Sequence, residues 1–494
     1  MKTTPASLIN KQFSSTDIAQ LRVFFKEWKI KNFHLLDSIS DTELEKELIS
    51  ISHEKRFYER WDADPNFQQK FLTDAYQTVI DYKLNINLEE IESLKERVIT
   101  HRKASESVSL SKELCREFYG KTKGEMYRDI AASSKDIRVK AWRSRQIARL
   151  SSQMIKSVHD QIPHMTAAFE LSKGCSVGCW FCSLSAPRLG DIFTYNQHNA
   201  KLWREVLELL KELLGIAAQA GFCYWATDPL DNPDYEKFCR DFYKILGVFP
   251  QTTTAQALKD PDRTRSLLKL SQELGWLINR FSILSLKMLD RVHQEFTPEE
   301  LAFVRLVLQN PEANEVKVNA GRAREHNKRK SEKSAVLPND LLPETNACVC
   351  GFLFNMVEGS VKLIAPCNAS DRWLQGYRIY QEGTFTNIDE LKILLQEMIE
   401  RHMPLTVKPS DRISFRRDLK YEILLNGFQV STIFKKYKFC NAPYFQHLGN
   451  MIHQGNKTAE EIVASFYCYG IPSSHIYQSL NLMFDNGLLD DEPL

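Results

Sequence analysis

The sequence predicts an α/β fold, with a helical N-terminal region before it and a C-terminal winged-helix module after it. Three observations support this fold class. Strand and helix patterns alternate from about residue 166, the region before them has helical periodicity, and a hairpin signal followed by short helices comes after them. The predicted domains are therefore 1–160, 161–404 and 405–494.

Helical periodicity characterises the first of these domains. Thr42 and Glu45 have the spacing of a capping box ahead of Leu48 and Ile51. Aromatic residues alternate with charged ones at 55–95, which is the ordinary pattern of packed amphipathic helices. The pattern indicates no particular function, and a cover over the core or a peptide-docking surface both fit it.

Strand-like and helical segments take turns in the core, and this order indicates a parallel sheet with crossover helices. In such folds the reactive site lies beyond the carboxyl ends of the strands. The expected strands are 169–175, 222–227, 251–257, 278–286 and 315–320, and the expected helices are 195–214, 234–246, 262–274 and 297–309.

Two further features follow the alternating segments. Residues 321–340 are polar, basic and without periodicity, so they fit a solvated loop or a mobile segment that touches substrate. Residues 348–367 have the pattern of a β-hairpin that turns near Glu358 and Gly359.

The last region carries the signals of a small winged-helix module. Asn426-Gly427 lies between two alternating runs, which is a strong hairpin signal. Three short helices should follow the hairpin. They are a helix at 444–453, a helix with the capping box Thr458 and Glu461, and a helix capped by Ser473 or Ser474 that ends at Asn486-Gly487.

Net charge and the distribution of apolar residues limit the kinds of protein that the chain can be. The net charge of +2 over 494 residues gives no reason to expect a nucleic-acid surface. The first residues lack the pattern of a secretion signal, and no run of about 18 apolar residues suggests a membrane helix. We therefore expect a soluble, cytoplasmic protein.

Eleven cysteines without a secretion signal argue against a disulfide framework. Several are scattered along the chain, and for these the role of a small buried hydrophobic residue is expected. The scattered cysteines are Cys115, Cys223, Cys239, Cys440 and Cys468.

The remaining cysteines include one compact motif. Cys175, Cys179 and Cys182 have the spacing CxxxCxxC directly after the first core strand. Three thiolates this close can hold three irons of a [4Fe–4S] cube and leave the fourth iron free for a cofactor. Gly174 and Gly178 allow the tight backbone of such a loop. A structural zinc site normally needs a fourth Cys or His, and none lies nearby in the sequence.

This loop resembles the signature of the radical S-adenosylmethionine (SAM) superfamily. The resemblance covers roughly 166–370 and implies a partial (β/α)6 barrel, a [4Fe–4S] cluster and SAM. It implies contacts of Phe181 with the adenine and of Ser282 with the ribose. At the place of the family's Gly-Gly-Glu-Pro stretch the chain departs from the pattern, because it has Ala226-Thr227-Asp228-Pro229. Thr227 and Asp228 could accept the hydrogen bonds of the cofactor's amino group, or Asp228 could be a turn residue before proline.

Several stretches look like a narrower group, the peptide epimerases that act on ribosomally made precursors of the proteusin type. They are residues 170–182, 280–286 and 365–380. The C-terminal module resembles the leader-peptide recognition domains of such enzymes, although a dimerisation element or a structural cap would also fit. The implied partners are a precursor peptide with its leader and an external one-electron reductant.

The resemblance implies that a 5′-deoxyadenosyl radical removes the Cα hydrogen of an L-residue and that a cysteine thiol returns hydrogen from the opposite face. Cys367 is the preferred donor because it begins a polar loop after a strand and a proline. Cys348 and Cys350 are the alternatives. Asp371 and Arg372 could position the peptide or form a local ion pair.

Two other functions remain open. A radical SAM enzyme that forms thioether or carbon–carbon crosslinks would commonly carry a cysteine-rich C-terminal extension, whereas only Cys440 and Cys468 lie in this tail. A non-enzymatic iron–sulfur or zinc regulator with a DNA-binding winged helix fits poorly with the near-neutral charge. Hydrolase motifs such as HExxH, GxSxG and the P-loop are missing from the sequence.

Overall fold

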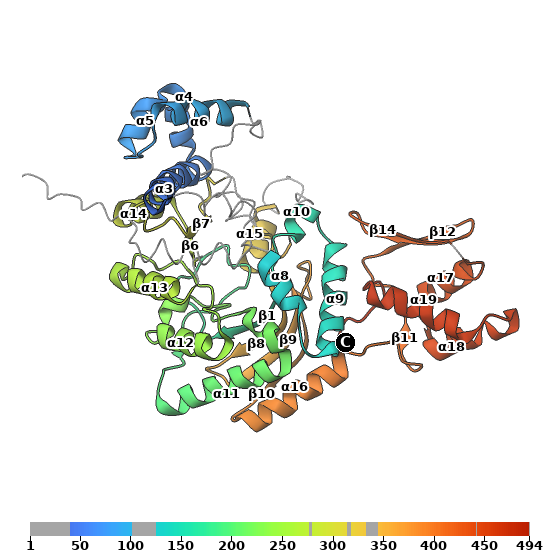
Figure 1. The fold of residues 1–494 in the computed structure, drawn as a ribbon. Helices are drawn as coiled ribbons and strands as arrows, with labels where there is room; N and C mark the ends of the chain where they lie inside the picture. The colour runs from blue at the N-terminus through green and yellow to red at the C-terminus, as the bar shows by residue number, and fades with distance from the viewer. Residues whose placement is uncertain are drawn as a thin grey trace, which may run out of the picture. The chain divides into compact units, whose positions relative to one another are not determined.

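A computed structural model describes residues 40–100, 125–275, 279–313, 318–331, 344–440 and 442–493 (Figure 1). The chain forms two compact units, each described below on its own. The first comprises Met1–Lys123, Asp228–Tyr243 and Val248–Val316, and the second comprises Gly124–Thr227, Lys244–Gly247 and Lys317–Leu494. Within the predicted N-terminal region, residues 1–39 and 101–124, with Cys115, lie outside the described residues.

The first unit begins with a group of helices, as the periodicity predicts. The capping box, however, is formed by Ser40 and Glu43 and not by Thr42 and Glu45. The Ser40 backbone N–H donates to Glu43 Oε2 over 2.8 Å, because the helix begins at Asp41, two residues before the predicted start. The helices are α3 (Asp41–Ala63), α4 (Pro65–Thr73), α5 (Ala75–Asp81) and α6 (Leu88–Thr100).

Aromatic side chains form the core of these helices. Phe57, Phe67 and Phe71 are fully buried, and the Phe57 and Phe71 rings meet edge to face with centroids 4.7 Å apart. Most of the aromatic residues at 55–95 therefore serve packing, as their spacing predicts, whereas Tyr76 is exposed.

The first unit also contains a three-stranded parallel sheet of β5 (Thr253–Thr254), β6 (Asn279–Ile283) and β7 (Val304–Leu308). The predicted helix at 297–309 is wrong, because β7 occupies its second half. Val304, Leu306 and Leu308 are buried while Arg305 and Val307 are half-buried, which is the period of a strand. Helix α14 (Leu286–Glu295) was not predicted, whereas α12 (Tyr235–Leu246) and α13 (Pro261–Glu273) confirm the predicted helices.

The second unit is built on a five-stranded mixed sheet in the order β10-β9-β8-β1-β4. Strand β1 pairs in parallel with both β4 and β8, and β9 pairs antiparallel with β8 and β10. The predicted hairpin at 348–367 is confirmed, with Gly359 in its turn at φ 57°. The strands are β1 (Met165–Glu170), β4 (Gly221–Phe222), β8 (Val349–Asn355), β9 (Ser360–Pro366) and β10 (Tyr377–Thr384).

Helices pack around this sheet. The predicted helix at 195–214 is confirmed as α11 (Gln197–Leu214), which buries Trp203, Leu207 and Leu210. The predicted loop at 321–340 is wrong in its first half, because residues 321–331 form α15, while 332–340 lie outside the described residues. Of the predicted strand at 315–320, residues 318–320 have no strand structure and 315–317 are not described. The other helices are α8 (Glu125–Ala132), α9 (Ile137–Ser151), α10 (Lys156–His159), α15 (Gly321–Ser331) and α16 (Ile388–His402).

The C-terminal module of the second unit contains a three-stranded antiparallel sheet, β12 (Lys420–Leu424), β13 (Gly427–Ser431) and β14 (Lys436–Phe439). The predicted hairpin at Asn426-Gly427 and the capping box of Thr458 and Glu461 are confirmed. The predicted Ser473 or Ser474 cap is wrong, because the helix begins after Pro472 without a side-chain cap. The helices are α17 (Phe445–Gln454), α18 (Ala459–Ala464) and α19 (Ser473–Asp485).

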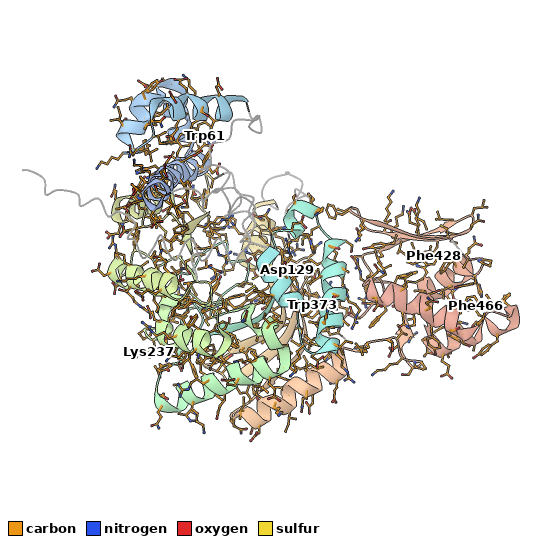
Figure 2. The ribbon with its side chains drawn as sticks, in the orientation of Figure 1. Trp61, Asp129, Lys237, Trp373, Phe428 and Phe466 are labelled. Atoms are coloured by element: carbon orange, nitrogen blue, oxygen red, sulfur yellow. The ribbon has the colours of Figure 1, made fainter. Side chains whose placement is uncertain are left out.

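Phe428 and Phe466, labelled in Figure 2, are buried in the core of this module. Helix α9 contacts β8 and β9 on one side and α19 on the other, so it joins the module to the five-stranded sheet. The chain is thus a mixed α/β protein. Among the helices that the structure describes, none is both long and apolar enough to cross a membrane.

Candidate functional site

The cysteine motif lies on a closed loop after β1. Strands β2 (Ser172–Lys173) and β3 (Asp191–Ile192) pair antiparallel and join the two ends of this loop, which spans residues 174–190 and is called the cysteine loop below. The Cys175 backbone N–H donates to Pro187 O over 2.9 Å. Gly174 has φ +84°, and a Cβ there would lie 2.4 Å from Arg188 O. Only glycine therefore fits the base of the loop.

The loop brings three thiols together. Cys175, Cys179 and Cys182 are all half-buried. Burial, with a smaller contribution from the neighbouring thiols of Cys182 and Cys175, raises the pKa of the Cys179 thiol to about 11. Backbone N–H groups of Val177 and Ala186 donate to the sulfurs of Cys175 and Cys182, both over 3.4 Å.

This donor set fits a [4Fe–4S] cluster held at three corners. Three thiols within electrostatic reach, with N–H donors to two of the sulfurs, are what such a cluster uses. Within the described residues, no three His, Cys, Asp or Glu side chains converge on one point as ligands of a single metal ion. The cluster does not need convergence, since each thiolate binds a different iron.

Helix α15 packs directly on the cysteine loop. The Arg322 backbone N–H donates to Cys182 O over 3.1 Å, and a Cβ at Gly321 would lie 2.3 Å from Ser183 O. The His326 ring lies 4.7 Å from the Trp180 ring, and Phe181 meets Trp180 edge to face. Sequence reasoning missed this helix, because its exposed polar residues give no apolar periodicity.

Cys367 follows β9 directly. Its side chain is 1% exposed, and its backbone N–H donates to Gly376 O over 2.9 Å. Burial raises the pKa of its thiol to about 11, although Arg378 and Arg149 act in the opposite direction. The thiol is therefore protonated at neutral pH.

The cysteine loop and the segment after Cys367 leave opposite ends of the sheet but meet again. Because β9 is antiparallel to β8 and β8 is parallel to β1, Cys367 lies at the amino end of β1, whereas the cysteine loop leaves its carboxyl end. The Gln375 Nε2 group nevertheless donates to Leu184 O over 3.0 Å. The structure thus joins the two segments by direct contact.

Of the two alternative donors, Cys350 is buried and Cys348 is half-buried. Cys350 is fully buried in β8, where burial raises the pKa of its thiol to about 11, and its carbonyl accepts from Arg143. Cys348 lies just before β8 and packs on Leu150 and Met154. Of the scattered cysteines, Cys223 and Cys239 are buried as predicted, but Cys440, which follows β14, and Cys468, in the short 3-10 helix Tyr467–Tyr469, are exposed.

Asp371 and Arg372 have different partners. The exposed Asp371 carboxylate accepts from Lys328 of α15 over 2.5 Å, and this ion pair lowers its pKa. The Arg372 guanidinium lies 4.8 Å from the centre of the Trp373 ring and donates to Pro493 O. The two residues thus border the segment after Cys367 without pairing with each other.

The residues expected to contact SAM divide between the two units. Phe181 and Thr227 belong to the second unit, and Asp228 and Ser282 to the first. The buried Asp228 carboxylate accepts from Thr254 Oγ1 and the Ala255 N–H, each over 2.7 Å, and from the Leu230 N–H over 3.0 Å. These bonds occupy three of about four acceptor positions. These bonds therefore support the second interpretation of Asp228, that of a residue that stabilises a turn.

A buried glutamate was missed by sequence reasoning. Glu170 ends β1 and accepts from the Ala226 N–H over 2.9 Å and from Asn355 Nδ2 over 3.0 Å. Burial raises the pKa of its carboxyl to about 7. It fastens the segment before Thr227 to the carboxyl ends of β1 and β8. The sequence signal that could have revealed it is its position at the end of the first core strand, shortly before the cysteine motif.

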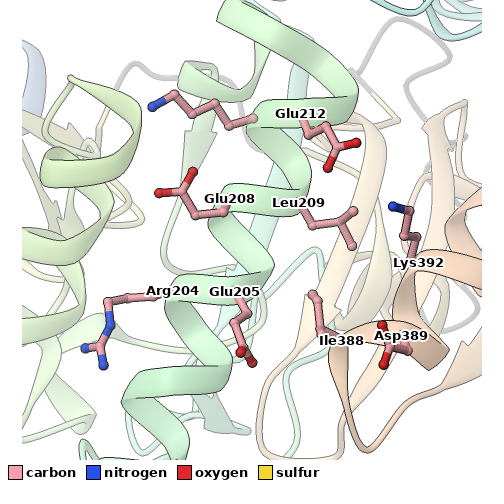
Figure 3. Close-up of a pocket in the computed structure, with 9 residues that line it drawn as sticks. Arg204, Glu205, Glu208, Leu209, Glu212, Ile388, Asp389 and Lys392 are labelled. Carbon is pink, nitrogen blue, oxygen red and sulfur yellow. The ribbon is translucent and has the colours of Figure 1, made fainter.

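One surface groove lies apart from these groups. A cavity of about 570 Å³ lies between α11 and α16 (Figure 3). Leu209 and Ile388 point toward each other across it, while Arg204 and Glu208 point away. Its lining contains no cysteine and no member of the cysteine loop, so it does not belong to the candidate site.

The chain was compared with family models, with solved structures and with other protein sequences. No protein-family model matches the chain. In fold it is similar to the crystal structure of BtrN in complex with AdoMet and 2-DOIA at a TM-score of 0.29 and 14% identity. That match covers 48% of this chain and 82% of the other, a likeness too slight to assign a fold. The uncharacterized protein y4wI of Sinorhizobium fredii (strain NBRC 101917 / NGR234) is 37% identical over 457 residues, which cover 90% of this chain and 88% of that protein. The chain therefore belongs to the family of protein y4wI.

Proposed function

We propose that the chain is a radical SAM enzyme whose cluster is held by Cys175, Cys179 and Cys182. The observation that carries the proposal is that one loop at the carboxyl end of β1, closed at its base by β2 and β3, carries three half-buried thiols at the spacing CxxxCxxC. When bound, the cluster and SAM would supply a radical that removes hydrogen atoms from unactivated carbon.

The protein's own residues would hold and shield this chemistry. The N–H groups of Val177 and Ala186 stabilise negative charge on two of the sulfurs. Helix α15 covers part of the loop through Arg322 and Gly321, which keeps water from one side of it. The proposed contacts of SAM are still Phe181, Thr227 and Ser282. Asp228 remains a proposed contact as well, although its hydrogen bonds to Thr254 and Ala255 also give it a role in the local turn.

We further propose that the reaction is epimerisation of L-residues to D-residues in a ribosomally made precursor of the proteusin type. Cys367 would give a hydrogen atom to the face of Cα opposite to the one that lost it. A donor of this kind must carry its proton, and with a thiol pKa of about 11 the protonated form exceeds the thiolate by about 10⁴ at pH 7. Each turnover leaves a sulfur radical that an external reductant must convert back to the thiol.

The C-terminal module is proposed to bind the leader of the precursor. Its sheet has two edge strands, β12 and β14, whose unpaired backbone groups can accept a further strand. The proposed domains remain 1–160, 161–404 and 405–494, with the radical SAM core in the second and the winged-helix module in the third.

A first experiment tests the radical SAM assignment without any peptide. Anaerobically reconstituted protein is incubated with SAM and dithionite, and 5′-deoxyadenosine and methionine are measured. The proposal predicts both products from the native chain and neither from the Cys179→Ala variant, which removes one of the three thiol ligands. Native protein that leaves SAM intact would refute the assignment.

A second experiment tests the epimerase assignment. Reconstituted enzyme acts on a candidate precursor in deuterated water, where the exchangeable Cys367 thiol carries deuterium. Each converted residue should gain about one mass unit, because the returned atom comes from this thiol. A product lighter by two hydrogens would point instead to crosslinking.

A further inference from the structure

A cavity beside Cys367 is not used by the chemistry described so far. Its volume is about 510 Å³, within the usual range of ligand pockets. It is named the Phe434 pocket here and lies between the end of α9 with α10, the segment after Cys367, and the turn between β13 and β14. All three walls belong to the second unit.

Hydrogen bonds between the walls hold the pocket in shape. Gln153 Nε2 donates to Asp418 Oδ2 of the C-terminal module over 2.8 Å, and Asn368 Nδ2 donates to Gln153 O over 3.2 Å. Trp373 Nε1 donates to Glu492 Oε1 over 2.7 Å. Because the cavity is already formed, the protein loses little conformational entropy when a ligand binds in it.

The rim of the pocket is apolar and exposed. Ile433 is 81% exposed, Ile155 41% and Phe434 38%, and all three line the cavity. Exposed apolar surface that is contiguous and rimmed by polar residues is a feature of ligand-binding grooves. The rim therefore favours a ligand with an apolar group.

The floor is charged but neutralised. Arg149 and Arg378 are 3% and 4% exposed, and both pair with carboxylates of the C-terminal tail. Arg149 donates to Asp491, and Arg378 Nε donates to Glu492 Oε1 over 3.2 Å. The charges that line the pocket balance, because Arg149, Arg378 and Arg417 are matched by the carboxylates of Glu344, Asp418 and Glu492. The floor therefore offers little to a phosphate or another free anion. A neutral ligand fits better.

The pocket borders the chain segment that follows Cys367, although Cys367 itself does not line it. The groups whose charges act most on the Cys367 thiol are Arg378, Arg149, Glu492 and Glu344, and all four line the pocket. The backbone continues from Cys367 directly into the wall residues Asn368 and Ser370. A ligand in the pocket would therefore contact the residues that directly follow the proposed hydrogen donor.

We propose that the Phe434 pocket binds an apolar residue of an extended peptide, with the side chain among Ile155, Ile433 and Phe434 and the backbone amides along Asn368 and Ser370. The pocket is bordered by both the C-terminal module and the segment after Cys367. It would thus hold the part of the precursor that runs from the bound leader to the reacting residue. That last role rests on the proposed function, whereas the binding itself does not.

The test uses a defined probe and needs neither cluster nor precursor. The probe is photo-leucine, a diazirine analogue of leucine, with an acetyl group at its amino end and a methylamide at its carboxyl end. The full-length protein is irradiated with the probe, and adducts are mapped by peptide mass spectrometry. The proposal predicts adducts at the residues of the pocket rim, with competition by capped leucine and none by capped glutamate at equal concentration.

Two variants make the test specific. Ile433→Asp, at a position too exposed to matter for folding, should lower pocket labelling about tenfold, because one apolar wall becomes charged. Leu425→Asp is the matched control, because Leu425 is 93% exposed on the other turn of the same sheet and lines no part of the pocket. It should leave pocket labelling unchanged.

The outcomes separate this inference from the proposed function. Labelling that is equal at Leu425 and at the rim, or that is insensitive to Ile433→Asp, would mean adventitious surface labelling only and would overturn the inference. Pocket labelling in a protein that does not cleave SAM would support the binding site and refute the radical SAM assignment. Cleavage of SAM without pocket labelling would overturn only the binding site.

Discussion

Replacing Gly174 by alanine should disrupt cluster binding far more than the same replacement at Gly178. Both glycines have positive φ, +84° and +66°, so each alanine carries a similar backbone strain of about 1–2 kcal/mol. At Gly178 the added Cβ meets no atom within 4 Å. At Gly174 it would lie 2.4 Å from Arg188 O and 2.8 Å from Pro187 O.

The difference between the two variants follows from these distances. Real Cβ atoms essentially never approach closer than 3.0 Å, so the Gly174→Ala backbone must shift by at least 0.6 Å from Arg188 O. That shift acts on the Cys175 N–H to Pro187 O bond, which closes the base of the cysteine loop. Losing this bond adds about 1 kcal/mol to the strain and moves the first cluster ligand.

The assay compares iron and acid-labile sulfide per chain after anaerobic reconstitution of the two variants. Thermal unfolding of the cluster-free proteins serves as the control for folding. We expect Gly178→Ala to retain most of the cluster and Gly174→Ala to lose most of it, with both proteins folded. Equal cluster content in the two variants would refute the assigned role of the loop base.

Three further predictions concern other parts of the chain. Cys367→Ala should abolish D-residue formation but retain SAM cleavage, as measured by 5′-deoxyadenosine release; D-residues from this variant would remove Cys367 as the donor. The pKa of Glu170 is raised from 4.5 to about 7, so the folded state binds the extra proton, and stability should fall by ~3 kcal/mol as pH rises from about 4.5 to 7. Denaturant titrations of native protein and Glu170→Gln should differ in this window, and parallel curves would argue against the shift. Phe71→Ala, which empties a fully buried site, should destabilise the N-terminal helices by about 3–5 kcal/mol without changing iron content, as followed by circular dichroism.

The features that could be predicted from the sequence are determined by residues that lie close together in the chain. Gly174 and the three cysteines fix the cysteine loop through backbone conformation and thiol chemistry within a few residues. The two hairpins carry their own turn signals at Gly359 and Asn426. Such local signals need no knowledge of the rest of the chain.

The incorrect predictions concern elements whose structure depends on contacts between distant parts of the chain. The apolar run at 301–308 fits a helix and a strand equally well by periodicity, and its pairing with β6 decides for the strand. Helix α15 lacks an apolar stripe and is positioned by the contact of Gly321 with Ser183. The surroundings of Cys367 come from Arg149, Arg378 and other residues far apart in the chain, which no local pattern reveals.

We propose that Cys175, Cys179 and Cys182 hold a [4Fe–4S] cluster at three corners. The most direct measurement is the iron, sulfide and zinc content of anaerobically reconstituted native protein and of the variant with all three cysteines replaced by alanine. We expect about four irons and four sulfides per native chain and close to none in the variant. Native protein that takes up one zinc and no iron, or a variant that retains the iron, would contradict it.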